Sequence, residues 1–175
     1  RIFHRSAGTW SEVDPGVAVP LLNWVHGTSA TDVFVGSNDG TILHFDGIGW
    51  TRQATPVSVP VWGVFAVAPT NVWAVGGNVS SSDPPFILHY DGAAWSRVPL
   101  PTLIRPRVAA FFKVWASGPD DVYAVGQNGV VVHYDGRGFT ELFLGISQDL
   151  IGIWGTGPEN VMVVGGRVTA ELAHF

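Results

Sequence analysis

One nine-residue pattern returns along this chain, and such tandem repetition limits the possible folds more than any other feature. The segment ILHFDGIGW at 42–50 recurs as ILHYDGAAW at 87–95 and VVHYDGRGF at 131–139, and in a more divergent form as IFHRSAGTW at 2–10. A catalytic motif usually occurs once, whereas a motif that recurs in tandem is usually the structural unit of a repeat fold. The pattern therefore predicts a repeat architecture.

A second pattern alternates with the first one. Its four versions are VHGTSATDVFVG (25–36), VFAVAPTNVWAVG (64–76), VWASGPDDVYAVG (114–126) and IWGTGPENVMVVG (153–165). The residue before the shared Val marks each unit, at Asp32, Asn71, Asp121 and Asn160. These markers are 39 (71−32), 50 (121−71) and 39 (160−121) residues apart. The basic unit is therefore 39 residues long, and the second unit carries insertions of six and five residues.

Within a unit, short apolar runs rich in Val, Ile, Phe, Tyr and Trp are separated by Gly, Asp, Asn and Pro, which is typical of strands and turns. One unit divides into strands A to D, expected around 114–116, 122–125, 130–134 and 139–142. Four strands in about 40 residues are the size of one β-propeller blade. We therefore expect an all-β fold, a β-propeller built from four-stranded blades of about 39 residues.

The chain is expected to form a single propeller domain or part of one. The approximate units are 1–20 (strands C and D only), 21–58, 59–108, 109–148 and 149–175 (strands A to C). If the two ends shared one blade, one copy of strand C would be surplus. A whole ring, half of a dimeric ring closed with a second chain, and a fragment of a longer array all remain open, since propellers usually have four to eight blades.

Composition excludes several classes of partner and cofactor. The net charge is −5 and the nine Lys and Arg residues are scattered, so there is no basic stripe for nucleic acid. No apolar run approaches the roughly 18 to 20 residues of a membrane-spanning helix. The sequence has no Cys, which excludes disulfides and thiolate metal sites. We expect no cofactor.

The histidines of the first pattern recur at one position of strand C, at His4, His44, His89, His133 and His174. Equivalent positions in different blades are spread around a ring, whereas metal ligands must lie about 2 Å from one ion. We therefore expect no metal site, and a structural role in which each His bonds a neighbouring loop. The Asp-Gly turns between strands C and D, which need positive φ, are also expected to be structural; they begin at Asp46, Asp91 and Asp135.

The sequence contains no catalytic motif. G-x-S-x-G, H-E-x-x-H and the P-loop are all missing from it. The adjacent Asp120 and Asp121 point to opposite sides of an extended segment and fit a turn better than an acid–base pair. We predict that this chain is not an enzyme.

The two insertions of the second unit are the best candidates for a specific site, because they depart from the repeat where the fold does not require it. They lie in the B–C connection (76–86) and in the following D–A connection (97–110), which emerge on the same face of a propeller. Loops on a rigid scaffold often carry binding residues. The predicted ligand-binding rim consists of Asn78, Ser80, Ser81, Ser82, Asp83, Arg105 and Arg107.

The combined pattern W-x-x-G-P-x-D-V-x-A-V-G … H-Y-D-G-x-x-W resembles the tandem repeats of bacterial secreted β-propellers. The segment SNDGTILHFDGIGW at 37–50 is similar to tectonin-type lectin repeats and, less closely, to Asp-box sialidase-like repeats. This resemblance implies a propeller that works outside the cell or at its surface. The resembling families include sugar binders, assembly factors and scaffolds. The scattered Arg residues do not form the arginine cluster expected of a sialidase.

From the sequence, the first hypothesis for function is a lectin-like module that binds a glycan. The repeated Trp10, Trp50 and Trp95 could stack on sugars between blades, or could instead form the core between blades. The alternative is a protein–protein interaction scaffold that uses the loop rim 76–86 and 97–110. A lectin should bind several ligands per chain, whereas a scaffold should bind one protein partner at the rim.

Overall fold

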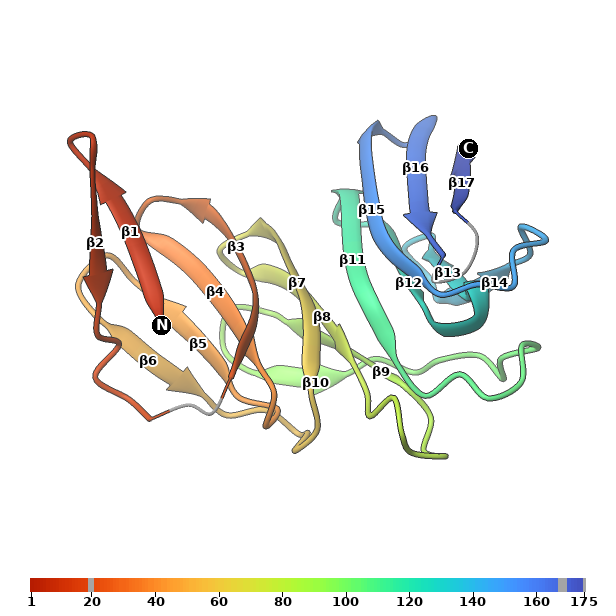
Figure 1. Cartoon of the computed structure of the whole chain (residues 1–175), viewed down its shortest axis with the longest axis horizontal. Helices are drawn as coiled ribbons and strands as arrows, with labels where there is room; N and C mark the ends of the chain where they lie inside the picture. The colour runs from red at the N-terminus through yellow and green to blue at the C-terminus, as the bar shows by residue number, and fades with distance from the viewer. Residues whose placement is uncertain (19–20, 167–169, 175) are drawn as a thin grey trace.

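A computed structural model describes residues 1–18, 21–166 and 170–174 of the chain, and antiparallel β-strands form almost all of its regular structure (Figure 1). Residues 19–20, 167–169 and 175, which belong to the first and last expected units, lie outside the described residues.

The strands form one hairpin and four sheets, each sheet being one blade. The hairpin pairs β1 (Ile2–Ser6) with β2 (Thr9–Val13). Blade 1 contains β3 (Leu22–Ser29), β4 (Asp32–Ser37), β5 (Ile42–Phe45) and β6 (Trp50–Gln53). Blade 2 contains β7 (Val61–Ala68), β8 (Asn71–Gly76), β9 (Phe86–Tyr90) and β10 (Trp95–Arg97). Blade 3 contains β11 (Phe111–Gly118), β12 (Asp121–Gly126), β13 (Val131–Tyr134) and β14 (Phe139–Leu142). Blade 4 contains β15 (Leu150–Gly157), β16 (Asn160–Gly165) and β17 (Glu171–His174).

The expected fold class is confirmed, because blades 1 to 3 are four-stranded antiparallel sheets in the order A-B-C-D. Strand A is longer than the sequence predicted: β11 runs over Phe111–Gly118. The helical structure in the described ranges is the short 3-10 segment Gln127–Gly129. No helix among these residues has the length and apolarity needed to cross a bilayer.

The Asp-Gly turns between strands C and D adopt the backbone conformation that their sequence predicts. Gly47, Gly92 and Gly136 have φ values of 91°, 94° and 86°, a region that favours glycine. At the first turn, Oδ1 of Asp46 accepts the backbone N–H groups of Ile48 and Gly49. These bonds lower the pKa of Asp46 below its ordinary value, since they favour the charged form.

The hydrophobic core lies between blades. Phe34 of blade 1 is fully buried against Val64 and Trp95 of blade 2, and Trp115 of blade 3 packs against Leu150 of blade 4. The inner blades are covered on both faces, which explains why their apolar residues form continuous runs and do not alternate with polar ones.

The blades follow one another in chain order as an open arc (Figure 1). Strand A of each blade contacts strand A of the next, from β3 to β7, β11 and β15. The hairpin β1–β2 lies at one end of this arc and blade 4 lies at the other (Figure 1). The chain therefore does not close a ring by exchanging strands between its own two ends.

Candidate functional site

The strand C histidines of all four blades bond to the first residue of strand B in their own blade. His44 Nε2 lies 2.7 Å from Oδ1 of Asp32, and His133 Nε2 lies 2.7 Å from Oδ1 of Asp121. The other two pairs are His89 with Asn71 at 3.1 Å and His174 with Asn160 at 2.6 Å. Carboxylate and amide oxygens accept hydrogen bonds, so the imidazole N–H is the donor in each pair.

A hydroxyl group completes this contact in blades 1 and 3. Thr28 donates to Oδ2 of Asp32, and Ser117 donates to Oδ2 of Asp121. Each hydroxyl bonds the carboxylate and not the imidazole, so the His is not placed to activate it as a nucleophile. These clusters fasten the A–B turn to strand C. In the ranges that the structure describes, no group of three or more His, Cys, Asp or Glu side chains could hold a metal ion.

His4 occupies the same template position in the hairpin. It pairs with Ser11 as His44 pairs with Thr51, so β1 and β2 reproduce the register of strands C and D. Within the described part of the chain, β1 pairs only with β2. His4 therefore has no strand B residue beside it to accept its N–H.

The two insertions of the second unit lie side by side, as the sequence predicted. An isolated bridge pairs Gly77 with Ala110, which joins the start of the B–C loop to the end of the D–A loop. A pocket of about 320 Å³ lies between the two loops. Its lining combines the apolar Pro84, Pro85, Leu100 and Leu103 with Ser82, Arg105 and Arg107.

The Arg105 side chain points into the protein and anchors the D–A loop. Its Nη1 donates to the backbone oxygens of Asn128, at 2.6 Å, and Ile146. The Glu141 carboxylate lies 3.9 Å from Nε and accepts the backbone N–H groups of Ile104 and Arg105. Only 10% of the Arg105 side chain is exposed. The prediction that Arg105 offers its charge to a ligand therefore needs correction, because the charge is used to hold the loop.

Arg107 has the opposite environment. It is exposed, and its backbone φ of 60° lies in the left-handed region that residues other than Gly seldom adopt. Among the described residues, no acceptor lies within hydrogen-bond distance of its guanidinium group. Arg107 is thus the rim cation that a partner can reach.

The polar residues of the B–C loop bond mainly to one another. Oδ1 of Asn78 accepts the N–H of Ser80 at 3.1 Å. The Ser81 hydroxyl donates to the Asp83 carboxylate and accepts the Asp83 N–H, both at 2.8 Å. These short-range bonds hold the loop in one shape, and Ser82 is the exposed hydroxyl beside the pocket.

Two residues outside the insertions hold the rim loops, and the sequence analysis did not single them out: Gln127 bonds both loops, and Asn128 bonds the D–A loop. Oε1 of Gln127 accepts the N–H of Ala109 at 2.9 Å, and its Nε2 donates to the Val79 oxygen at 3.4 Å. Nδ2 of Asn128 donates to the Arg107 oxygen at 3.1 Å. Both belong to the B–C turn of blade 3, whose position next to the insertions was the available signal.

The three repeated Trp residues lie in different environments. Trp95 is 6% exposed and packs against Phe34 between blades 1 and 2, so a sugar cannot stack on its ring. Trp50 is half-buried beside Phe45, with 5.2 Å between ring centroids. Trp10 of the hairpin is 66% exposed. The burial of Trp95 corrects the expectation that all three could serve as equivalent sugar sites.

Lys113 joins strands A of three consecutive blades. Its Nζ lies 3.7 Å from the ring centroid of Trp24 in β3 and donates to the backbone oxygen of Trp62 in β7 at 3.3 Å. Burial lowers the pKa of Lys113 to about 8. The charge is used inside the fold, where it links blades 1, 2 and 3.

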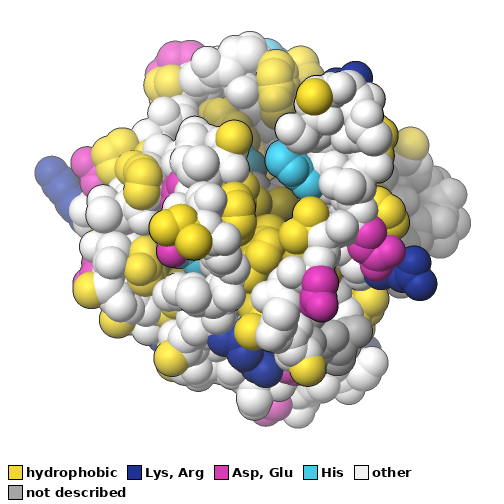
Figure 2. All heavy atoms as spheres, turned by 90° about the vertical axis from the view of Figure 1, so that its left-hand side faces the viewer, with side chains coloured by type: hydrophobic (Ala, Val, Ile, Leu, Met, Phe, Trp, Pro, Cys, Tyr) yellow, Lys and Arg dark blue, Asp and Glu magenta, His cyan; other side chains and the backbone are white. Residues whose placement is uncertain are grey.

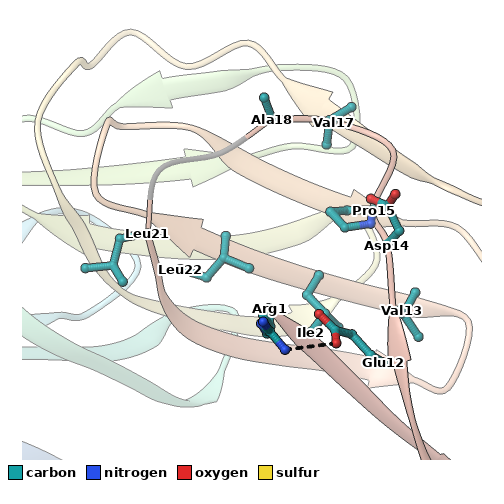
Figure 3. Close-up of a pocket in the computed structure, with 10 residues that line it drawn as sticks. All are labelled: Arg1, Ile2, Glu12, Val13, Asp14, Pro15, Val17, Ala18, Leu21 and Leu22. Atoms are coloured by element: carbon teal, nitrogen blue, oxygen red, sulfur yellow. Dashed lines mark hydrogen bonds and ion pairs between the residues drawn. The ribbon is translucent and has the colours of Figure 1, made fainter.

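A larger cavity, of about 550 Å³, lies between the hairpin and blade 1 (Figure 3). Ile2 and Leu22 line it from the two sides, and an ion pair joins Arg1 to Glu12 at 3.2 Å. Neither insertion contributes to it. The cavity is therefore a gap between the hairpin and blade 1, separate from the rim.

Four-stranded blades placed side by side, with one elaborated loop rim, define the class of this protein as β-propeller-like. Solved structures of YCF48 share the fold. "YCF48 bound to D1 peptide" superposes with a TM-score of 0.62 at 13% sequence identity, covering 90% of this chain and 55% of that one. "YCF48 from Cyanidioschyzon merolae" superposes with a TM-score of 0.57 at 16% identity, covering 88% and 56%. At these identities the likeness shows the fold alone.

This chain spans a little over half the length of those two structures. No protein-family profile matches its sequence, and no curated protein does so either.

Proposed function

We propose that this chain is a non-catalytic module that binds a protein partner at the loop rim. The partner would present an extended peptide segment with apolar side chains and a carboxylate. The supporting observation is the pocket between the two insertions, in which apolar side chains and one free cation, Arg107, lie together. Binding pockets commonly combine an apolar lining with a few polar groups that fix orientation.

The rim is built to keep its shape. Arg105 and Glu141 anchor the D–A loop to blade 3, and Gln127 bonds to both loops. A site held in its binding conformation loses less conformational entropy when the partner binds. This rigidity therefore favours a binding role for the rim over the alternative that the two insertions are surface loops without a function.

The fold comparison supports the same kind of partner. One of the similar structures is "YCF48 bound to D1 peptide", so a protein of this fold binds a peptide. At 13% identity the likeness does not identify the partner of this chain. Its peptide is therefore specified here only by the chemistry of the rim.

Glycan binding was the first hypothesis from the sequence, with equivalent sugar sites at the repeated Trp residues. These sites are not equivalent, because Trp95 is buried while Trp10 is exposed. Glycan binding becomes the competing outcome of the experiment below. Placement outside the cell or at its surface is inferred from the resemblance to secreted propeller repeats alone.

A displayed library of random 12-residue peptides, selected on the immobilised chain, tests the proposal. We expect the selected peptides to carry Asp or Glu close to apolar residues. The substitution Arg107→Glu should weaken their binding at least tenfold, because a like charge then faces the peptide carboxylate. Arg137→Glu, which makes the same charge change in the exposed C–D turn of blade 3, should leave the affinity unchanged.

A glycan array probed with the same sample separates the two hypotheses. Selection of no peptide, or of peptides that bind equally well to the Arg107→Glu variant, would reject the rim as the site. Binding to a defined glycan that is lost on Trp10→Ala would favour the lectin-like function instead.

A further inference from the structure

His26 joins blade 1 to blade 2 through a ring nitrogen that acts as a hydrogen-bond acceptor. Its Nδ1, in β3, accepts the backbone N–H of Ala66, in β7, at 3.0 Å. Because the donor is a backbone amide, Nδ1 must carry a lone pair, and the neutral ring holds its proton on Nε2. The two strands lie side by side at the junction of the blades (Figure 1). The bond therefore requires an uncharged imidazole.

The Ala66 amide lies where the backbone pairing inside blade 2 is irregular. The register of the β7–β8 ladder shifts between Ala66 and Ala68. At such a shift a residue is left outside the regular ladder, and a buried backbone N–H without an acceptor is costly. The His26 ring supplies this acceptor from the neighbouring blade.

The next two junctions have no such acceptor at the same position. The strand registers place His26, Phe65 and Trp115 at one position of strand A in blades 1, 2 and 3. The Phe ring has no polar atom, and the Trp indole is a donor only. His26 also stacks on Phe65, with 4.3 Å between ring centroids. Among these three residues, only His26 can gain or lose a proton in the physiological range of pH.

The strand C histidines use their rings in the opposite sense. Each presents Nε2 to a side-chain oxygen of Asp or Asn, so each is a donor; the four are His44, His89, His133 and His174. A second proton on the ring leaves that Nε2–H in place. An imidazolium ion has two donors and no acceptor, so protonation preserves these four contacts and removes the one made by His26.

The elements packed around His26 offer little to stabilise its charged form. Neither β7 nor the rest of β3 carries an ionisable side chain. In β4 the ionisable residue is Asp32, which is paired with His44, and in β11 it is Lys113, a cation held over Trp24. Seen from the hairpin end, hydrophobic side chains gather in a hollow while most charged ones lie toward the outline (Figure 2).

We propose that the junction between blades 1 and 2 is an acid-sensitive hinge. Protonation of His26 at Nδ1 sets two N–H donors against each other and ends the bond to Ala66. Blade 1 then loosens from β7, while blades 2 to 4, which are joined by apolar contacts, stay together. The side chain of Asn23, whose Nδ2 donates to the Val61 oxygen at 3.1 Å, keeps the two blades tethered.

The direction of the pH effect follows from the burial of the ring. Burial lowers the pKa of His26 below its ordinary value of 6.5. The unfolded chain therefore takes up this proton at a higher pH than the intact junction does. The contribution of His26 to the junction is complete above pH 6.5 and is lost as the pH falls below that value.

NMR of the whole chain tests the proposal without any substitution. At about pH 7.5 the ring ¹⁵N shifts of His26 should show the neutral form with its proton on Nε2. On acidification the Ala66 amide signal should move with the same midpoint as the His26 ring. Hydrogen exchange, corrected for its own pH dependence, should become about tenfold faster or more in β3 and β7 at about pH 5, and should stay slow in β12 and β13.

Two substitutions separate the acceptor from the charge. His26→Asn places an amide oxygen near the position of Nδ1 and does not titrate, so the acid step at Ala66 should disappear while protection is retained. His44→Gln, which keeps a donor for Asp32, is the matched control and should leave the step unchanged. A His26 ring protonated on Nδ1 at neutral pH, an Ala66 signal that ignores the titration, or a step that persists in His26→Asn would each overturn the proposal.

Discussion

His133 Nε2 lies 2.7 Å from Oδ1 of Asp121, and this contact fastens strand C of blade 3 to the turn that joins strands A and B. Both side chains are about a quarter exposed or less. The same pair of positions is used in all four blades, with Asn in place of Asp in two of them. The contact therefore belongs to the construction of the blade.

Replacing Asp121 with Ala should lower the free energy of unfolding by about 1–3 kcal/mol, because it leaves the partly buried N–H of His133 without an acceptor. Asp121→Asn should cost less than about 1 kcal/mol, since Asn160 in blade 4 accepts a hydrogen bond from His174 and donates one to the Thr156 hydroxyl. Urea unfolding measures both. Equal losses for the two variants would show that the charge matters and not the hydrogen bonds.

Arg105→Met should destabilise the chain by about 2–4 kcal/mol, because it removes charge-assisted bonds and leaves the buried Glu141 carboxylate without its cation. Arg107→Met should change stability by no more than about 0.5 kcal/mol, since that side chain is exposed. Urea unfolding, with limited proteolysis of the D–A loop, measures the difference. If both variants behaved alike, Arg105 would not be the anchor of the rim.

Gly77→Ala should cost about 2 kcal/mol or more. Gly77 has a φ of 142°, and a Cβ there would lie 2.0 Å from the Ala109 backbone oxygen, so the bridge between the two rim loops would have to open. Gly138→Ala, where nothing lies within 4 Å of the added Cβ, is the control and should be neutral or slightly stabilising. Thermal melting compares them, and a neutral Gly77→Ala would contradict the tight approach of the loops.

Lys113 should make stability rise with pH in the alkaline range. Its pKa is about 8 in the folded chain and 10.5 for the ordinary group, so the unfolded chain binds the proton more tightly between these values. Unfolding then takes up protons, and the free energy of unfolding increases from about pH 8 to about pH 10.5. This increment should be absent in Lys113→Met, when the two proteins are compared by urea unfolding across that range. An NMR titration in which the Lys113 side chain protonates near 10.5 would contradict its burial.

Much of the blade could be read from the sequence because it depends on local patterning. The Asp-Gly turns require positive φ wherever they occur, and Gly47, Gly92 and Gly136 all have it. Strand D of blade 3 was predicted at 139–142 and lies there. Strand A was placed too short, because each of its ends, at Phe111 and at Gly118, lies beyond a register irregularity and pairs with strand B only in the folded sheet.

The candidate rim was predictable in position but not in the role of each residue. Insertions that break a repeat are visible in the sequence, and they meet because adjacent connections emerge on one face. The direction of a long side chain is not visible there: Arg105 turns inward to Glu141 and the Asn128 oxygen, whereas Arg107, two residues later, stays free. The contribution of Gln127 comes from a neighbouring blade and has no counterpart in the insertion itself.

The sequence by itself determined the repeat, the strand order and the turns, because each of these depends on residues within a few positions of one another. Only the tertiary structure decided which repeated residues are covered. Trp115 and Trp154 occupy the same position of strand A, yet one is 7% exposed and the other 61%. Burial is decided by whether another blade lies against the residue, and that neighbour is a property of the assembled arc, not of the repeat.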